Sequence, residues 1–346
     1  IYYDNALYDL ACHYKKNSEN ELALSYYEKL LAETKDVKFI ADAHLSKGMI
    51  YFNNGKIDQA IISFLFVVSN FQQTIYFKEA LSGLQLAYVS LAKVDEYLAI
   101  IDGLPEISIS RAEQDSLTYN TAFMKFFEED YRVANTTFNQ YLDKFENGIF
   151  KIDAIYYNAI SCLKVGDTIN AVLMYTELIE VSNSEYKQSA LSFLARNYFA
   201  VEDYANSNIY YQDLAKVASN NSLKREAVIR LMYGNERLNT ELAYSFAQEV
   251  VNLDKTDDWL KSRAKIIIAR HEFATGNYAK SKTTFEYLVE LSDYDEGAEA
   301  KYYLAYLTYL DDSLVLAEKM IFELAENYAS DHFIAKAFIL LADIYV

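Results

Sequence analysis

Six of the eight arginines in this chain lie between positions 196 and 270: Arg196, Arg225, Arg230, Arg237, Arg263 and Arg270. A guanidinium presents its donors in a planar fork that matches a carboxylate. A group of arginines can therefore hold an acidic side chain or a carboxyl terminus by paired, charge-assisted hydrogen bonds. The same residues could instead be ordinary solvated side chains whose long stems cover helix surfaces.

Acidic residues also stand side by side, at 128–130 and 202–203, and such pairs could supply a general acid and a general base. We place both groups at tight turns, where neighbouring side chains point apart and water surrounds them, so their pKa values have little reason to shift. Cys12, Cys162 and the four histidines show no metal-ligand spacing. The sequence therefore predicts no catalytic residue, no metal and no cofactor, and we expect a protein that is not an enzyme.

The elements that carry these residues follow a repeated pattern. In residues 154–179, AIYYNAISCLKVGDTINAVLMYTELI, two apolar helical patterns flank the breaker Gly166-Asp167. Small residues, Ala159 and Ala171, stand where two helix backbones must approach closely. This pattern predicts a helix, a tight turn and a returning helix.

The small-residue position of the second helix recurs along the whole chain, at intervals of 36 to 38 residues: Ala23, Ala60, Tyr97, Ala134, Ala171, Ser207, Ala243, Ser281 and Ala317. A sustained period of this length indicates a solenoid, in which each repeat packs mainly on its neighbours. We expect an all-α fold in which a single superhelical domain spans residues 1–346. It should contain nine helix hairpins and a half repeat at 335–346, with an irregular connection in the polar stretch from Glu106 to Gln114.

Composition agrees with this class and narrows the range of partners. The chain is 52% hydrophobic, with one proline and nine glycines, which favours helices. Its net charge of −18 should repel nucleic acids and anionic membrane surfaces. The most apolar run, residues 61–68, is far shorter than the roughly 20 residues of a membrane span.

The second repeat carries a more specific pattern. Gly48 is followed by an aromatic at Tyr51, a turn glycine at Gly55, a small residue at Ala60 and a second aromatic at Phe64. This arrangement resembles the tetratricopeptide repeat family, and the resemblance implies a right-handed α-solenoid. The linkers at 70–80, 144–154 and 327–337 share an aromatic, a second aromatic five residues later and an alanine. They resemble tetratricopeptide proteins of the bacterial envelope, of the BamD and YbgF types, although those usually carry a proline after the first aromatic.

In that family the first helices line a concave groove that receives a peptide or helix of a partner. Carried over to this chain, the resemblance implies these partner-binding residues: Tyr119, Phe123, Phe126, Tyr156, Arg196, Phe199, Arg225, Arg263, Arg270, Phe273, Tyr302, Tyr306 and Tyr309. Within a helix their spacings of three, four and seven keep each set on one face. The aromatic members could instead pack between neighbouring repeats, and only their exposure can separate the two interpretations.

We therefore expect a noncatalytic scaffold for protein–protein interaction, with Arg196, Arg263 and Arg270 facing an acidic or C-terminal carboxylate segment of a partner. The alternative is a regulatory or substrate-recruiting region of a larger enzyme or peptide sensor whose active domain lies outside this sequence. The chain begins at Ile1 rather than methionine and ends in a half repeat, so we expect it to be a fragment of a longer protein. The envelope resemblance predicts a periplasmic or outer-membrane-associated location, and the alternative is cytoplasmic.

Overall fold

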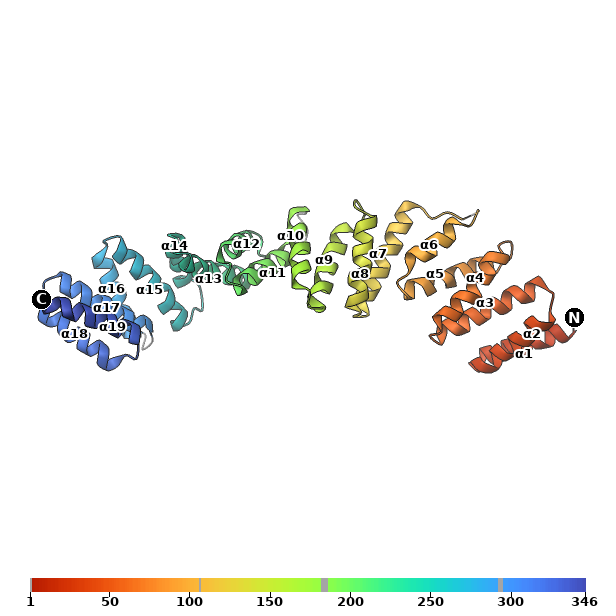
Figure 1. Ribbon diagram of the computed structural model, residues 1–346, viewed down its shortest axis with the longest axis horizontal. Helices are drawn as coiled ribbons and strands as arrows, with labels where there is room; N and C mark the ends of the chain where they lie inside the picture. The colour runs from red at the N-terminus through yellow and green to blue at the C-terminus, as the bar shows by residue number, and fades with distance from the viewer. Residues whose placement is uncertain (1, 106, 182–185, 292–294) are drawn as a thin grey trace. The chain divides into compact units, whose positions relative to one another are not determined.

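The structure, a computed structural model, describes residues 2–105, 107–181, 186–291 and 295–346. These ranges contain nineteen α-helices and no β-strand (Figure 1). The helices are α1 (Tyr2–Lys16), α2 (Asn20–Glu33), α3 (Val37–Asn53), α4 (Ile57–Asn70), α5 (Phe77–Ser90), α6 (Val94–Asp102), α7 (Arg111–Phe127), α8 (Tyr131–Lys144), α9 (Lys151–Lys164), α10 (Thr168–Val181), α11 (Lys187–Ala200), α12 (Tyr204–Val217), α13 (Asn221–Arg237), α14 (Leu242–Val251), α15 (Asp258–Ala274), α16 (Tyr278–Leu291), α17 (Asp295–Leu310), α18 (Leu314–Asn327) and α19 (Asp331–Ile344). The predicted all-α class, with nine hairpins and one further helix, is confirmed.

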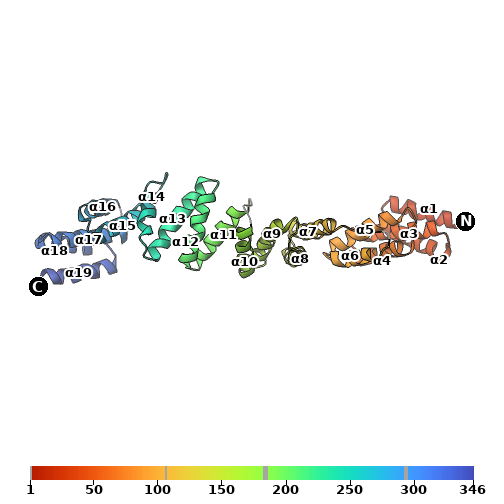
Figure 2. The same ribbon diagram turned by 90° about the horizontal axis from the view of Figure 1, so that it is seen from above.

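Each hairpin consists of an odd-numbered helix and the even-numbered helix that follows it. The two helices of a hairpin pack on each other, as α3 does on α4, and the second helix also packs on the first helix of the next hairpin. First helices touch as well, for example α3 with α5 and α15 with α17. Figures 1 and 2 show this succession of hairpins from two directions.

The chain divides into two compact units, Ile1–Glu177 and Leu178–Val346. The boundary falls inside α10, so it does not coincide with a linker. Each unit is a run of consecutive hairpins. The expectation of a single superhelical domain stays a prediction.

The recurring small-residue position marks the core of every hairpin. All nine of its residues lie in a second helix and are buried, with exposed fractions between 0% and 7%. At Tyr97 the large side chain is also buried, and its helix, α6, has only nine residues. The predicted helix register is therefore confirmed, since a slip of one residue would turn these positions toward water.

Every hairpin turn contains one residue in the left-handed conformation, with φ between 53° and 85°: Ser18, Gly55, Ala92, Glu129, Gly166, Glu202, Asn239, Gly276 and Asp312. The next residue then donates its N–H to a carbonyl five positions earlier, as Asp167 does to Cys162 at 2.8 Å. This bonding satisfies carbonyls that a helix end leaves open and reverses the chain. Gly166-Asp167 is thus the turn that the sequence predicts.

Two boundaries differ from prediction. Residues 107–110 are not helical, but α7 already begins at Arg111, while Glu106 lies outside the described residues. Ser110 and Glu113 form a capping box that satisfies the first N–H groups of α7, which the interpretation of 106–114 as an irregular connection overlooked. The last helix begins at Asp331, four residues before the predicted half repeat, where its carboxylate suits the positive end of the helix dipole.

Candidate functional site

Two of the predicted arginines use their donors within the chain. Arg196 in α11 holds Glu226 in α13 by two hydrogen bonds of 2.6 Å, which also keep the pKa of Glu226 below its usual range. Arg225 donates to the carbonyl oxygens of Asp254 and Lys255, at 2.6 and 3.4 Å, in the segment between α14 and α15. Both arginines therefore tie neighbouring hairpins together.

The other two predicted arginines belong to a cluster of five charged side chains. Glu236 of α13 accepts hydrogen bonds from Arg263 at 3.1 Å and from Arg270 at 2.9 Å. Arg270 also forms a two-fold contact of 2.5 Å with Glu299, and Arg263 lies 3.4 Å from Glu296. Burial opposes the charge on Arg270, but the hydrogen bonds and charge of Glu299 raise its pKa. This cluster joins α13, α15 and α17.

The predicted aromatic residues mostly contact rings of adjacent elements. Tyr119 is only 7% exposed and stacks on Phe150 at 4.5 Å between ring centroids, so it is a core residue rather than an exposed anchor. Phe123 and Phe126 of α7 each lie 5.0 Å from the ring of Tyr157 in α9. The remaining members, all half-buried, are Tyr156, Phe199, Phe273, Tyr302, Tyr306 and Tyr309.

Several of these half-buried rings seal one helix against the next. The ring centroids of Phe273 in α15 and Tyr303 in α17 are 4.9 Å apart, and those of Tyr302 in α17 and Phe333 are 6.2 Å apart. Phe333 belongs to α19. These contacts support the packing interpretation. A role for the exposed parts of these rings in partner binding stays a prediction.

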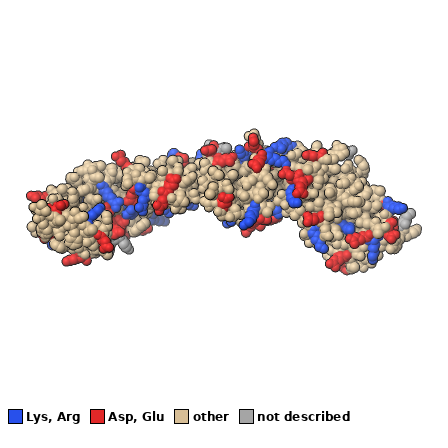
Figure 3. Space-filling view, viewed as in Figure 1, with Lys and Arg blue, Asp and Glu red and all other residues tan. Residues whose placement is uncertain are grey.

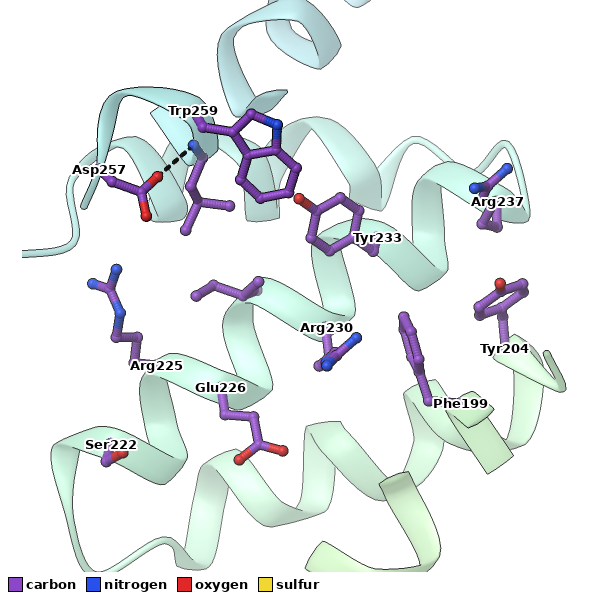
Figure 4. Close-up of a pocket in the computed structure, with 12 residues that line it drawn as sticks. Phe199, Tyr204, Ser222, Arg225, Glu226, Arg230, Tyr233, Arg237, Asp257 and Trp259 are labelled. Atoms are coloured by element: carbon purple, nitrogen blue, oxygen red, sulfur yellow. Dashed lines mark hydrogen bonds between the residues drawn. The ribbon is translucent and has the colours of Figure 1, made fainter. Parts of the chain in front are cut away.

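A cavity of about 630 Å³ opens on α13 within the second unit (Figure 4). Its wall is formed by the end of α11, the start of α12, one face of α13 and the start of α15. The lining residues are Phe199, Tyr204, Ser222, Arg225, Glu226, Ile229, Arg230, Tyr233, Arg237, Asp257, Trp259 and Leu260. Two predicted site residues, Arg225 and Phe199, are therefore brought together here.

The face of α13 follows from helical spacing. Glu226, Arg230, Tyr233 and Arg237 are separated by four, three and four positions, so they form one stripe along the helix. Between them, Gly234 packs on α12, where an added Cβ would lie 2.2 Å from Asn208 Oδ1. The glycine replaces the first-helix aromatic of other repeats because α12 approaches α13 closely at this point.

Two guanidinium groups in the cavity have no carboxylate partner among the residues that the structure describes. Arg230 lies over the ring of Phe199 at 4.5 Å, a cation–π contact, and Arg237 is exposed. Of the two lining carboxylates, Glu226 is held by Arg196 and Asp257 accepts a hydrogen bond of 2.7 Å from the N–H of Leu260. Three arginines against these two carboxylates give the lining a net charge of +1, in a chain of net charge −18.

Trp259 and Tyr233 complete the site. Trp259, the only tryptophan in the chain, is 56% exposed and is positioned by the helix cap that Asp257 forms for α15. The hydroxyl of Tyr233 points toward Trp259 in Figure 4 and is buried without a hydrogen-bond partner. Burial raises the pKa of Tyr233. An unpaired buried hydroxyl costs about 1–3 kcal/mol, which an arriving acceptor could recover.

Four residues of the cavity, Arg230, Arg237, Tyr233 and Trp259, are not among the groove residues that the family resemblance implies. The sequence does carry a signal for them: the lone tryptophan stands two residues after Asp257, which caps α15, and the other three form a stripe on α13.

The surface charges, the possible metal ligands and the hydrophobic helices give no second candidate site among the described residues. On the face drawn in Figure 3, acidic and basic side chains are interspersed. Within the described ranges, no three His, Cys, Asp or Glu side chains are grouped to hold a metal, and both cysteines are free. In the same ranges no helix has the length and apolarity needed to cross a bilayer. The absence of a cofactor stays a prediction.

Comparisons with known proteins give one family match and several distant structural likenesses. Residues 8–66 match the family model described as tetratricopeptide repeat. No curated protein sequence matches the chain. The envelope resemblance and the cellular location therefore stay predictions.

Among solved structures, the TPR domain of P58(IPK) is 14% identical, with a TM-score of 0.30 and coverage of 99% of this chain and 98% of that one. A tetratricopeptide repeat protein from Parabacteroides merdae is 14% identical, with a TM-score of 0.29 and coverage of 77% and 98%. A structure of Naa15/Naa10 bound to HypK-THB gives 15% identity and a TM-score of 0.37, with coverage of 96% of this chain and 54% of that chain.

The family model spans residues 8–66, most of the first two hairpins. The later hairpins have a buried residue at the recurring small-residue position and a left-handed turn residue, as the first two do. Residues 8–66 are therefore similar to a tetratricopeptide repeat, and the hairpins that follow share their local structure.

Proposed function

We propose that this chain is a noncatalytic scaffold that binds a segment of another protein on the exposed face of its first helices. Tetratricopeptide repeats generally mediate protein–protein interactions, and this chain carries them. The finer proposal concerns where the partner binds: the cavity on α13 is its principal contact point.

The observation that supports this proposal is the composition of the cavity. Trp259 exposes its indole there, and Arg230 and Arg237 keep their hydrogen-bond donors free of carboxylates in the described part of the chain. Tryptophan, tyrosine and arginine are the residues most enriched among those that dominate binding energy at interfaces. A cavity of about 630 Å³ lies within the range of about 300–1,000 Å³ that is usual for binding sites.

The other predicted arginines contribute to the scaffold in a different way. Arg196, Arg263 and Arg270 are engaged by glutamates of adjacent first helices, so a partner's carboxylate would have to displace an ion pair to reach them. We assign them the role of fixing the positions of α11, α13, α15 and α17. Partner recognition then depends on the side chains that these ion pairs leave available.

The test is a selection of peptides from a displayed random library on the immobilised chain, followed by hydrogen exchange of the complex. We expect selected peptides to protect amides at the start of α15 and along α13. Trp259→Ala should weaken binding by about tenfold or more, as the loss of a buried interface aromatic does.

The matched control is Tyr287→Ala, which removes a partly exposed aromatic from a second helix, α16. It should leave the affinity unchanged. A library that yields no binding peptide, or peptides that protect only second helices, would contradict the proposed function.

A further inference from the structure

Two arginines that form no ion pair with a carboxylate of the described residues are separated along one helix face. Arg230 and Arg237 are seven positions apart on α13, which is about 10 Å along the helix axis. Both line the same cavity, and Figure 4 shows them at different points of its wall. Residues three apart in a polyproline II segment lie on one face about 9 Å apart, which is close to this length. Two separate carboxylates at that spacing would therefore match the two cations.

Three helices contribute apolar side chains to the cavity. Trp259 and Leu260 come from the start of α15, Ile229 and Tyr233 from α13, and Phe199 from the end of α11. An aromatic ring can stack on the exposed indole of Trp259 and lose apolar surface to water. The unpaired hydroxyl of Tyr233, which points toward Trp259, is a donor for an oxygen that enters beside the ring.

The geometry points to an internal segment of a partner protein in which two acidic residues flank an aromatic residue. This inference rests on the proposed function and specifies its ligand. The carboxylates bind Arg230 and Arg237, and the aromatic ring enters the cavity against Trp259.

Charge complementarity favours an internal segment over a chain end. A carboxyl terminus supplies one carboxylate group to a site with two unpaired guanidinium groups. The lining has two anionic side chains: Glu226, which Arg196 holds and whose pKa the charge of Arg230 also lowers, and Asp257, which accepts the N–H of Leu260. Against Arg225, Arg230 and Arg237 these two charges leave the lining with a net charge of +1. Because the whole chain carries a net charge of −18, recognition of an acidic segment must depend on this local site.

The sole tryptophan provides the measurement. The full chain is titrated with the capped peptide Ac-Glu-Phe-Gly-Glu-amide while Trp259 fluorescence is excited at the red edge, where the 32 tyrosines absorb little. We expect a saturable change in emission. Replacing both peptide glutamates by glutamine, or the phenylalanine by alanine, should weaken binding by about tenfold or more. A peptide that ends in phenylalanine with a free carboxyl group tests the chain-end alternative and should also bind more weakly.

Variants of the protein identify the groups. Arg230→Gln and Arg237→Gln should each weaken binding of the diacidic peptide by about tenfold, and the double variant by about a hundredfold. Arg132→Gln, which removes an exposed arginine of the first unit, is the charge-matched control and should change the affinity by less than about twofold. Circular dichroism checks that each variant is folded.

Three results would overturn the inference: no binding of the diacidic peptide, equal binding of its glutamine form, or affinities unaltered by both arginine changes. The proposed function is judged separately by the library selection. Selected peptides that bind the wild type and the Arg230→Gln and Arg237→Gln double variant equally would leave the scaffold intact and refute only the diacidic ligand.

Discussion

Gly48→Ala should destabilise the first unit, although alanine is the better helix former. A Cβ at position 48 would lie 2.6 Å from Phe64 Cδ1 and Cε1, and a Cβ at Gly83 would lie 2.6 Å from Phe64 Cζ. The ring is 2% exposed and has a glycine of α3 and a glycine of α5 against it, so moving away from one brings it onto the other. Overpacking costs about 1–3 kcal/mol, whereas exchanging glycine for alanine in a helix contributes about 1 kcal/mol. The difference is a net loss of up to about 2 kcal/mol.

The assay is urea unfolding of the wild type, Gly48→Ala, Phe64→Leu and the double variant, with hydrogen exchange of α3 to α5 because repeat proteins can open locally. The smaller leucine side chain that Phe64→Leu introduces should remove the conflict, so that in its background the alanine at 48 becomes neutral or stabilising. Gly83→Ala should behave in the same way. If Gly48→Ala alone raised the free energy of unfolding by about 1 kcal/mol, the full difference in helix propensity between alanine and glycine, the packing argument would be refuted.

Four further substitutions test the small-residue position, the turns and a half-buried histidine. Ala171→Leu at a fully buried position should cost about 1–3 kcal/mol by overpacking, and an unchanged thermal midpoint would contradict the register. Ala92→Gly should raise the free energy of unfolding by about 0.5–1 kcal/mol, because the steric cost of alanine at φ 57° exceeds the entropy cost of glycine. Gly166→Ala should lower it by a similar amount, and urea titrations measure both changes. Burial lowers the pKa of His44, stacked on Phe66, to about 4. In the unfolded chain the His44 imidazole binds a proton from about pH 6.5 downward, whereas in the folded chain it does so only near pH 4. The contribution of His44 to stability should therefore be complete above about pH 6.5 and be lost as the pH falls toward 4. His44→Gln should lose less stability between the same two pH values.

The hairpins could be predicted from the sequence because a solenoid makes structure nearly one-dimensional. Each small residue packs against its own hairpin and the next, so a period of 36 to 38 residues is enough to place Ala171 or Ser207 in the core. Helix boundaries were harder to predict where a capping side chain determines the first residue of the helix. Ser110 and Glu113 start α7 inside a stretch whose polar composition is equally typical of a loop.

The site was predicted only in part, because the partner of each side chain lies on a different helix. Helical spacing gives the face of one helix but not the side chain that meets it from the next. Arg263 and Arg230 look alike in the sequence, and both lie on first helices. Only the neighbouring helices determine that one guanidinium is held by Glu236 and Glu296 while the other lies over Phe199.

The contacts between repeats explain why the cavity lies where it does. Arg196 meets an acidic residue 30 positions later, Arg263 one 33 positions later and Arg270 one 29 positions later. At those three offsets from Arg230 the chain has Leu260, Arg263 and Trp259, and from Arg237 it has two isoleucines and Arg270. At the offsets where the other arginines have a glutamate of the next hairpin, the sequence therefore has Trp259 and Leu260 for Arg230, whose guanidinium lies over Phe199 of the preceding hairpin instead. Among the residues that the structure describes, Arg196, Arg263 and Arg270 thus form ion pairs with glutamates, whereas Arg230 and Arg237 form none and line a cavity with the exposed Trp259. The proposed partner segment would supply the carboxylates that the next repeat lacks at these positions.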